Sequence, residues 1–445
     1  MKGSILSAGK NRKRSALNKY LEGYSECETQ VIDTLISNIK ACYDHSLVIP
    51  VYDESFDALS TLINSSFNDE LVLFILVVNC PIKGDLESSE RTLKLWGQLL
   101  TSAEQPYKID NIVYSKKHDG HGLLLIDRCS DSRQIPKKQG VGLARKTGAD
   151  IACALIAKGL IGSRWIHSTD ADVILPSDYF CCSDEVAKKN VALVYPFEHI
   201  PESGYETASE LYDLSLRYYV ESLHWAGSHY AYHTIGSLIA VDFEAYAKVR
   251  GFPKRAGGED FYLLNKLAKV GEVLSLDEPV IKVSARPSHR VPFGTGPALK
   301  KIVQESGESF VFYNPEIFKC LKQFIESLEL AEKLHDKLIG EQESKCSADI
   351  LPELNGNILN ALDSLGFYSA WNHAKVHSGS LSQDRHGQFI KHITTWFDAF
   401  VTLKFIHFLR NNFYPSVGLS ELGERTDYLS PQLQAKISKL TLRIE

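Results

Sequence analysis

The sequence predicts an α/β protein with an open sheet, followed by a region built only of helices. Strand-like and helix-like segments alternate at parallel-sheet spacing over roughly 150 residues. Residues 71–78 are eight consecutive apolar residues, which is typical of a strand covered on both faces. After about residue 300 only helical periodicity remains. We therefore divide the chain into an N-terminal arm and helix (1–44), an α/β domain (45–299) and a helical region (300–445).

The individual elements follow from periodicity and turn residues in chain order. Residues 1–23 are polar and basic and are expected to form a loose arm. Apolar residues at helical spacing predict helices at 28–43, 56–67, 84–104, 140–158, 206–223, 246–251 and 261–269. Apolar or β-branched runs that end in polar turns predict strands at 46–51, 71–78, 109–114, 122–127, 164–169, 191–196, 235–243, 273–276 and 280–283. The later helices are expected at 318–339, 358–367 and 389–413.

Composition restricts the classes of function. The chain has 445 residues, 44% hydrophobic and 23% charged, as is ordinary for a soluble globular protein. A net charge of −6 gives no reason to expect nucleic acid or an anionic membrane as a partner. The most apolar stretch, 396–413, is interrupted by charged residues, so we expect no transmembrane segment. Nine cysteines without a Cys-x-x-Cys pair and the lack of a visible signal peptide indicate free thiols in the cytoplasm.

The strand predicted at 164–169 leads into two carboxylates, Asp170 and Asp172, with one small residue between them. If this segment stays extended, both side chains project on the same side. Two such carboxylates repel each other unless a cation lies between them, and Mg²⁺ or Mn²⁺ suits oxygen ligands together with substrate phosphates. The alternative is an acidic turn on a solvated surface.

Five segments occur in an order that resembles the GT-A fold glycosyltransferases, most closely the family 2-like group. They are 49–54 (Ile-Pro-Val-Tyr-Asp-Glu), the apolar strand to Val78, 142–148 (Gly-Leu-Ala-Arg-Lys-Thr-Gly), 170–172 (Asp-Ala-Asp) and 258–263 (Gly-Glu-Asp-Phe-Tyr-Leu). The resemblance covers residues 45–297. It implies an open mixed sheet of the Rossmann-like GT-A kind with helices on both faces, in a catalytic domain at 45–299. The family's aromatic motif after the acidic pair is missing, and so are membrane helices, which argues against a processive polysaccharide synthase.

By this resemblance Asp172 binds a Mn²⁺ or Mg²⁺ ion, Asp170 shares the metal or approaches the ribose, and His289 completes the metal shell or clamps phosphate. The metal neutralises the diphosphate leaving group. Asp260 is the matching candidate for the base that takes the proton of the acceptor hydroxyl, with Glu259 beside it. The alternative for this acidic pair is stabilisation of a helix N-terminus.

The remaining candidates are substrate-binding residues. The resemblance also implies that Glu54 lies near the nucleotide base. Tyr52 and Asn79 lie where strands end and ligands bind in such sheets. By the same resemblance either Arg145 or Lys146 contacts the nucleotide; the alternative is that both lie on a solvated helix face. The basic loop that follows the last strand offers Arg286 and Arg290 as a phosphate clamp. The histidine- and aromatic-rich segment 224–233 places His233 on the acceptor side, whereas Trp225 and Tyr232 are either sugar-stacking or core residues.

The sequence thus predicts a metal-dependent glycosyltransferase with a nucleotide-sugar donor, an acceptor hydroxyl of a carbohydrate, lipid or small molecule, and an inverting mechanism. One alternative is a nucleotidyltransferase of related fold that makes the nucleotide sugar, although residues 52–59 lack the glycine-rich basic loop of that class. The other is a non-catalytic module that binds a sugar or a nucleotide. The helical tail either packs over the catalytic domain, forms a homodimer or docks an acceptor or partner.

Overall fold

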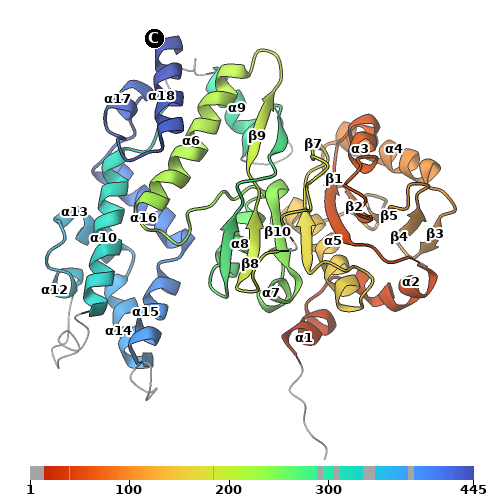
Figure 1. Cartoon of the computed structure of the whole chain (residues 1–445), viewed down its shortest axis with the longest axis horizontal. Helices are drawn as coiled ribbons and strands as arrows, with labels where there is room; N and C mark the ends of the chain where they lie inside the picture. Colours follow the sequence, from red (N-terminus) through yellow and green to blue (C-terminus); the bar gives the residue numbers. More distant parts are fainter. Residues whose placement is uncertain are drawn as a thin grey trace, which may run out of the picture. The chain divides into compact units, whose positions relative to one another are not determined.

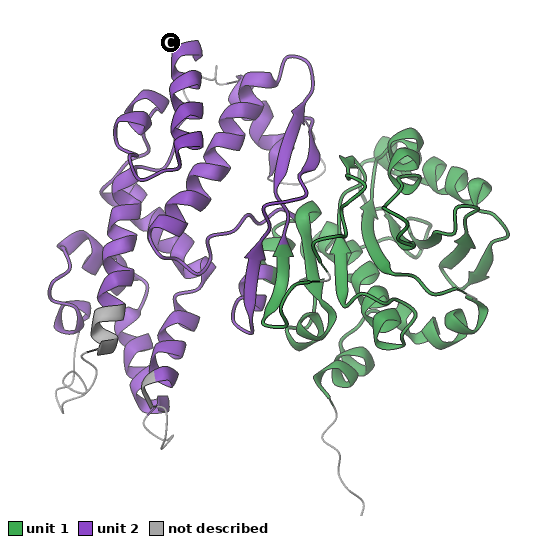
Figure 2. Ribbon diagram, in the orientation of Figure 1, with its two compact units in different colours: residues 1–193, 236–263 green, residues 194–235, 264–445 purple. Residues whose placement is uncertain are grey.

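The computed structural model describes residues 15–39, 41–183, 185–287, 294–304, 310–333, 346–378 and 385–444. The chain divides into two units: residues 1–193 with 236–263, green in Figure 2, and residues 194–235 with 264–445, purple in Figure 2. This division follows spatial contacts, whereas the borders after residues 44 and 299 follow the sequence pattern and stay predictions.

The first unit contains a large mixed sheet, as predicted. Its strands lie in the order β8-β10-β6-β1-β2-β5-β4-β3 (Figure 1). Strands β6, β1, β2 and β5 are parallel, and β10 pairs antiparallel with β6, as β4 does with β5 and β3. The bounds are β1 His45–Val51, β2 Val72–Asn79, β3 Tyr107–Ile109, β4 Ile112–Lys116, β5 Gly122–Arg128, β6 Trp165–Ser168, β7 Val173–Ile174, β8 Asn190–Val194 and β10 Ile239–Asp242.

Helices cover both faces of this sheet. The bounds are α1 Ala16–Gly23, η1 Cys27–Val31, α2 Ile32–Asn38, α3 Phe56–Ile63, α4 Leu86–Ser102, α5 Gly140–Ala157, η2 Gly236–Leu238, α7 Phe243–Lys248 and α8 Glu259–Leu267, the last running on into the second unit. Helix α4 packs on β2, and α5 packs on β1, β2 and β6. The chain moves from β1 to β2 and β5 and then back past β1 to β6, so right-handed crossovers place α5 on the face opposite to α3 and α4. All residues of β2 are accordingly buried.

The register brings the carboxyl ends of three parallel strands to one edge. Val51 of β1 pairs with Val78 of β2, and Val48 pairs with Ser168 at the end of β6. The central strand ends close to Thr169, as predicted. Ligands of open α/β sheets bind at such an edge, next to the point where the strand order reverses, which here lies between β1 and β6.

Gly148 lets α5 approach the sheet closely, because a Cβ atom there would lie 2.5 Å from Cγ1 of Val48. We expect Gly148→Ala to lower the free energy of unfolding by about 1–3 kcal/mol through overpacking. Gly97 is a matched control, since it lies in α4 with no atom within 4 Å of an added Cβ. Gly97→Ala should raise the free energy of unfolding by about 0.5–1 kcal/mol. Urea unfolding of both variants measures the difference, and a Gly148→Ala variant as stable as Gly97→Ala would contradict this packing.

The second unit is mainly helical and contains the helical C-terminal region that the sequence predicts. Strands β9 and β12 pair in parallel, and the helices surround one apolar core that includes Leu214, Phe318, Phe324 and Phe405. The bounds are β9 Phe197–Pro201, α6 Glu206–Trp225, β11 Glu272–Ser275, β12 Ile281–Ala285, α9 Thr295–Gln304, α10 Pro315–Lys333, α12 Ser347–Ile350, α13 Gly356–Ser364, α14 Phe367–Ser378, α15 Arg385–Trp396, α16 Ala399–Asn412, α17 Leu419–Glu424 and α18 Pro431–Ile444.

Three local expectations differ from the structure. The arm expected at 1–23 contains helix α1, whose Tyr20 is buried in the first unit. The helix expected at 28–43 is a short 3-10 helix followed by α2. The helical segment 389–413 is divided at Asp398, whose carboxylate accepts hydrogen bonds from the N–H groups of Phe400 and Val401 and so starts α16.

Two sequence expectations concern the whole chain. Among the described residues, none of the helices combines the length and apolar character that crossing a membrane requires. The structure describes all nine cysteines and joins none of them in a disulfide bond.

Candidate functional site

Arg145 of α5 gathers the two acidic motifs of the first unit into one site. Its Nη2 lies 2.6 Å from Oδ1 of Asp170, and its Nε lies 2.9 Å from Oε1 of Glu259. Nη1 donates to the hydroxyl of Ser168 at 2.8 Å and is 3.3 Å from the carbonyl oxygen of Thr169. The acidic residues that follow β6 and those that begin α8 therefore meet at one guanidinium group, although about 90 residues separate them in the sequence.

The position of Arg145 follows from the burial of α5. This helix is apolar on nearly all sides, and its residues from Gly142 to Ile156 are buried. A buried charge must be paired, and only 4% of the Arg145 side chain is exposed. The solvated-face alternative for Arg145 and Lys146 is therefore wrong, because both side chains are buried and ion-paired. A nucleotide contact by Arg145 stays a prediction.

Asp260 lies in the first turn of α8, next to Glu259. Burial of its carboxyl group and then the charge of Glu259 raise the pKa of Asp260 from the ordinary 3.8 to about 7. Its Oδ1 accepts the N–H of Phe261 at 2.7 Å, which lowers this pKa, as the charge of Arg145 also does. A carboxylate with a pKa near neutrality is suited to general-base catalysis. Glu259 pairs with Arg145 and thereby orients the start of the helix.

Asp170 and Asp172 lie after the end of β6, but not in an extended segment, because Ala171 and Asp172 form a turn. The same-side geometry expected for an extended backbone therefore does not apply. Arg145 holds one oxygen of Asp170, and 38% of that side chain is exposed. Asp172 is half-buried.

This donor set is compatible with a magnesium-like ion. Among the described residues, no group of three or more His, Cys, Asp and Glu side chains could hold a metal ion. Mg²⁺, however, is usually held by only one or two carboxylates together with water and substrate phosphates. Asp170 and Asp172 are carboxylates next to the carboxyl edge of the sheet, and their role as metal ligands stays a prediction. His289 lies outside the described residues, so its place in the metal shell stays a prediction.

The residues predicted for nucleotide binding lie at the same edge of the sheet. Tyr52 and the buried Glu54 follow β1, and Asn79 ends β2 with 5% of its surface exposed. Oδ1 of Asn79 is buried and has no hydrogen-bond partner among the described residues. Asp53 has a φ of 56°, a conformation that Asn and Asp adopt more readily than other side chains.

Asp53 is held by helix α4 rather than left for a ligand. Its carboxylate accepts hydrogen bonds from Nε of Arg91 at 2.6 Å and from the hydroxyl of Ser88 at 2.9 Å. Its backbone N–H donates to Oγ1 of Thr92 at 2.9 Å. Asp53 thus fixes the turn from which Tyr52 and Glu54 project.

The other predicted site residues belong to the second unit or lie outside the described residues. His233 packs edge-on against Phe197 with ring centroids 5.1 Å apart, and burial lowers its pKa to about 4. Arg286 is half-buried directly after β12. Arg290, like His289, is outside the described residues. The roles of these four residues stay predictions.

Two aromatic residues of segment 224–233 pack within the protein, as the core alternative to sugar stacking predicts. The indole of Trp225 stacks on Tyr428 with centroids 4.2 Å apart, next to the apolar core of the second unit. Tyr232 is 5% exposed.

The role of Arg145 as the residue that joins the two acidic motifs was not predicted. One signal for it exists in the sequence. Between residues 140 and 157 the only charged residues are Arg145, Lys146 and Asp150. A helix this apolar must be buried on most sides, so its few charges need partners from elsewhere in the fold. Which partners they find depends on tertiary structure.

Comparisons with known proteins give distant structural likenesses only. No protein-family model and no curated protein matches the sequence. The structure is similar to the crystal structure of S. aureus TarS 1-349 in complex with UDP-GlcNAc, with a TM-score of 0.35, 11% identity, and coverage of 90% of this chain and 88% of that chain. Structures of TarS 1-349 and of its complex with UDP each give a TM-score of 0.33, 10% identity, and coverage of 79% of this chain and 90% of that chain.

Proposed function

We propose that this chain is a metal-dependent glycosyltransferase that moves a sugar from a nucleotide-sugar donor to an acceptor hydroxyl with inversion. The observation that carries the proposal is the meeting of Asp170 and Glu259 on the buried Arg145. A single pair of acidic residues is often a surface turn or a helix start. Two pairs from distant segments that meet at the carboxyl edge of an α/β sheet lie where the ligands of such sheets bind, which supports a substrate site there.

In the proposed reaction, the acceptor oxygen attacks the anomeric carbon, and the bond from that carbon to the diphosphate breaks. Asp260 accepts the proton that the acceptor hydroxyl releases, which its pKa of about 7 permits near neutral pH. Arg145 keeps Glu259 and Asp170 in place during this step. A divalent cation held by Asp172 and Asp170 would neutralise charge on the leaving diphosphate.

Residues at the ends of β1 and β2 are proposed to bind the nucleotide. The buried Oδ1 of Asn79 can accept a hydrogen bond from a base N–H or a ribose hydroxyl, which would satisfy an otherwise unpaired acceptor. Tyr52 and Glu54 project from the neighbouring strand end. We also propose that His233 contacts the acceptor, that Arg286 and Arg290 bind phosphate, and that His289 is a metal ligand.

A panel of nucleotide sugars tests the proposed function most directly. The purified full chain is incubated with each donor and Mn²⁺, with and without a mixture of simple glycosides as acceptors, and released nucleoside diphosphate is measured. We expect release with at least one donor and more of it with an acceptor. Binding without release would favour the non-catalytic module. Pyrophosphate formed from a sugar phosphate and a nucleoside triphosphate would favour the nucleotidyltransferase.

The variant Asp172→Ala should weaken metal-assisted nucleotide binding without destabilising the folded protein. We expect its affinity for a nucleoside diphosphate in the presence of Mn²⁺ to fall by about 100-fold, because a carboxylate ligand is lost. The thermal unfolding midpoint should stay within about 3 °C of wild type, since Asp172 is half-buried in a turn. Calorimetric titration with and without Mn²⁺ measures the first effect, and Asp178→Ala, downstream in the same loop region, is the control. Unchanged Mn²⁺-dependent affinity would exclude Asp172 as a ligand.

A further inference from the structure

The N-terminal segment 15–31 is anchored on the face of α5 that carries Lys146 and Asp150. The hydroxyl of Tyr20 lies 2.5 Å from Oδ1 of Asp150 and 2.5 Å from Nζ of Lys146. Tyr246 donates to the same carboxylate oxygen at 2.7 Å. Tyr20 is 1% exposed, and Asp150 is fully buried. The segment is thus held by charged and phenolic groups that would be costly to leave unpaired.

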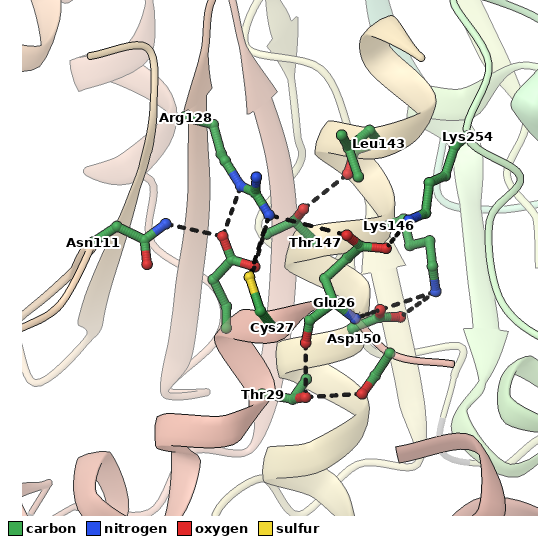
Figure 3. A network of polar contacts seen from close by, with 12 residues as sticks. Glu26, Cys27, Thr29, Asn111, Arg128, Leu143, Lys146, Thr147, Asp150 and Lys254 are labelled. Atoms are coloured by element: carbon green, nitrogen blue, oxygen red, sulfur yellow. Dashed lines mark hydrogen bonds and ion pairs between the residues drawn. The ribbon is translucent and has the colours of Figure 1, made fainter. Parts of the chain in front are cut away.

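The same segment reaches three further parts of the first unit, as Figure 3 shows. The backbone N–H of Glu26 donates to Oδ2 of Asp150 at 2.8 Å, and its carboxylate lies 2.7 Å from Nζ of Lys254 (Figure 3). Glu28 pairs with Nε of Arg128 at 2.7 Å and accepts a hydrogen bond from Asn111 at 2.9 Å. Residues 26–28 therefore tie α5 and β5 to the loop that contains Lys254.

That loop, residues 251–258, directly precedes Glu259 and Asp260. On one side it lies against the start of α5. The N–H of Gly142 donates to the carbonyl oxygen of Arg255 at 2.9 Å, and a Cβ on Gly142 would lie 2.5 Å from the carbonyl oxygen of Pro253. On the other side the loop meets the N-terminal segment. A Cβ on Gly251 would clash with the hydroxyl of Tyr20, and the carboxylate of Glu26 pairs with Lys254.

We propose that residues 15–31 act as an intramolecular clamp that positions loop 251–258, and through it the Glu259–Asp260 pair, for catalysis. This inference rests on the proposed function for its catalytic part. Glu26 and Lys254 are positioning residues: neither contacts Arg145, Asp170 or Asp260, and both act through the loop. A displaced base lowers the rate of proton transfer far more than it weakens donor binding, because an error of about 1 Å in placement costs up to about 100-fold in rate.

Two variants release the clamp without removing buried charge from α5. Glu26→Gln keeps the backbone hydrogen bond to Asp150 and removes the ion pair to Lys254, and Lys254→Met removes the same pair from the other side. Lys254→Arg is the conservative variant and should behave as wild type. Asp33→Asn is the matched control, because Asp33 makes an ion pair of the same 2.7 Å length to Lys158 at the end of α5, but on the surface and away from the loop.

Hydrogen exchange of the full chain measures whether the clamp holds the loop in place. Steady-state kinetics measure whether that placement affects catalysis. We expect amide exchange in residues 252–262 to become about 10-fold faster in Glu26→Gln and Lys254→Met, with β1 and β2 unchanged, and to stay at the wild-type rate in Lys254→Arg and Asp33→Asn. On the best nucleotide sugar of the panel, kcat should fall about 10-fold with KM for the donor within about 2-fold.

The outcomes distinguish the clamp from the proposed function. Equal exchange in residues 252–262 for Glu26→Gln and Asp33→Asn would overturn the clamp. Faster exchange with unchanged kcat would overturn its catalytic part. Faster exchange in a chain that turns over no nucleotide sugar would support the clamp as a loop-positioning device and reject the glycosyltransferase assignment.

Discussion

Arg145→Met should lower the free energy of unfolding by about 3–5 kcal/mol, because it leaves the buried carboxylate of Glu259 without its partner. Glu259 is 3% exposed and its Oε1 lies 2.9 Å from Nε of Arg145. Methionine fills most of the volume of the arginine stem, so the loss reports mainly on charge. Urea unfolding at pH 7.5 measures the change, and the proposed transferase activity should disappear as well because both acidic motifs lose their common anchor.

The double variant Arg145→Met/Glu259→Gln tests the reason for that loss. Removing the unpaired charge should restore about 1–3 kcal/mol relative to Arg145→Met, which a loss of packing alone would not do. Arg91→Met is the surface control: Arg91 also pairs with an aspartate, Asp53, at 2.6 Å, but 54% of its side chain is exposed. We expect it to change the free energy of unfolding by less than about 1 kcal/mol. An Arg145→Met variant no less stable than Arg91→Met would contradict the buried bridge.

The parts of this fold that local pattern determines could be predicted from the sequence. The apolar run 71–78, rich in Val and bounded by polar turns, indicated a strand covered on both faces, and β2 occupies Val72–Asn79. The central strand ends at Ser168, next to the expected Thr169, since an aspartate pair is a poor continuation of a buried strand. Helix α5 begins at Gly140, as its glycine pair indicated.

The sequence indicated candidate residues but not their arrangement. Asp170 and Glu259 were each identified from local motifs, yet the residue that joins them was assigned to a nucleotide contact or a solvated face. Side-chain partners across distant segments depend on how α5 packs on β6 and on where Arg145 meets the start of α8, and periodicity carries no information on either. The polar composition of residues 1–23 similarly gave no sign that Tyr20 enters a buried ionic cluster.

Asp260→Asn should make the protein more stable than wild type above pH 7 and about equally stable near pH 4. Because burial raises the folded-state pKa of Asp260 to about 7, the folded chain binds one proton more than the unfolded chain between about pH 4 and pH 7. Wild-type stability therefore falls as pH rises through this window. The neutral amide of the variant has no such proton to lose, and it keeps an oxygen that can accept the N–H of Phe261. Above pH 7 we expect an advantage of roughly 4 kcal/mol for the variant.

The activity of the same variant should change in the opposite direction. In wild type, kcat/KM should rise with pH through an apparent pKa of about 7, since only the ionised Asp260 accepts the acceptor proton. Asp260→Asn should lower kcat about 10²–10⁴-fold at pH 8, where Asp260 of the wild type is ionised, and should remove this limb, with donor affinity retained. A carboxylate that only stabilises the start of α8 predicts the reverse for stability, because replacing a favourable N-terminal charge costs free energy. Unfolding curves at pH 4, 6 and 8 therefore separate a buried base from a helix-end charge before any acceptor is known.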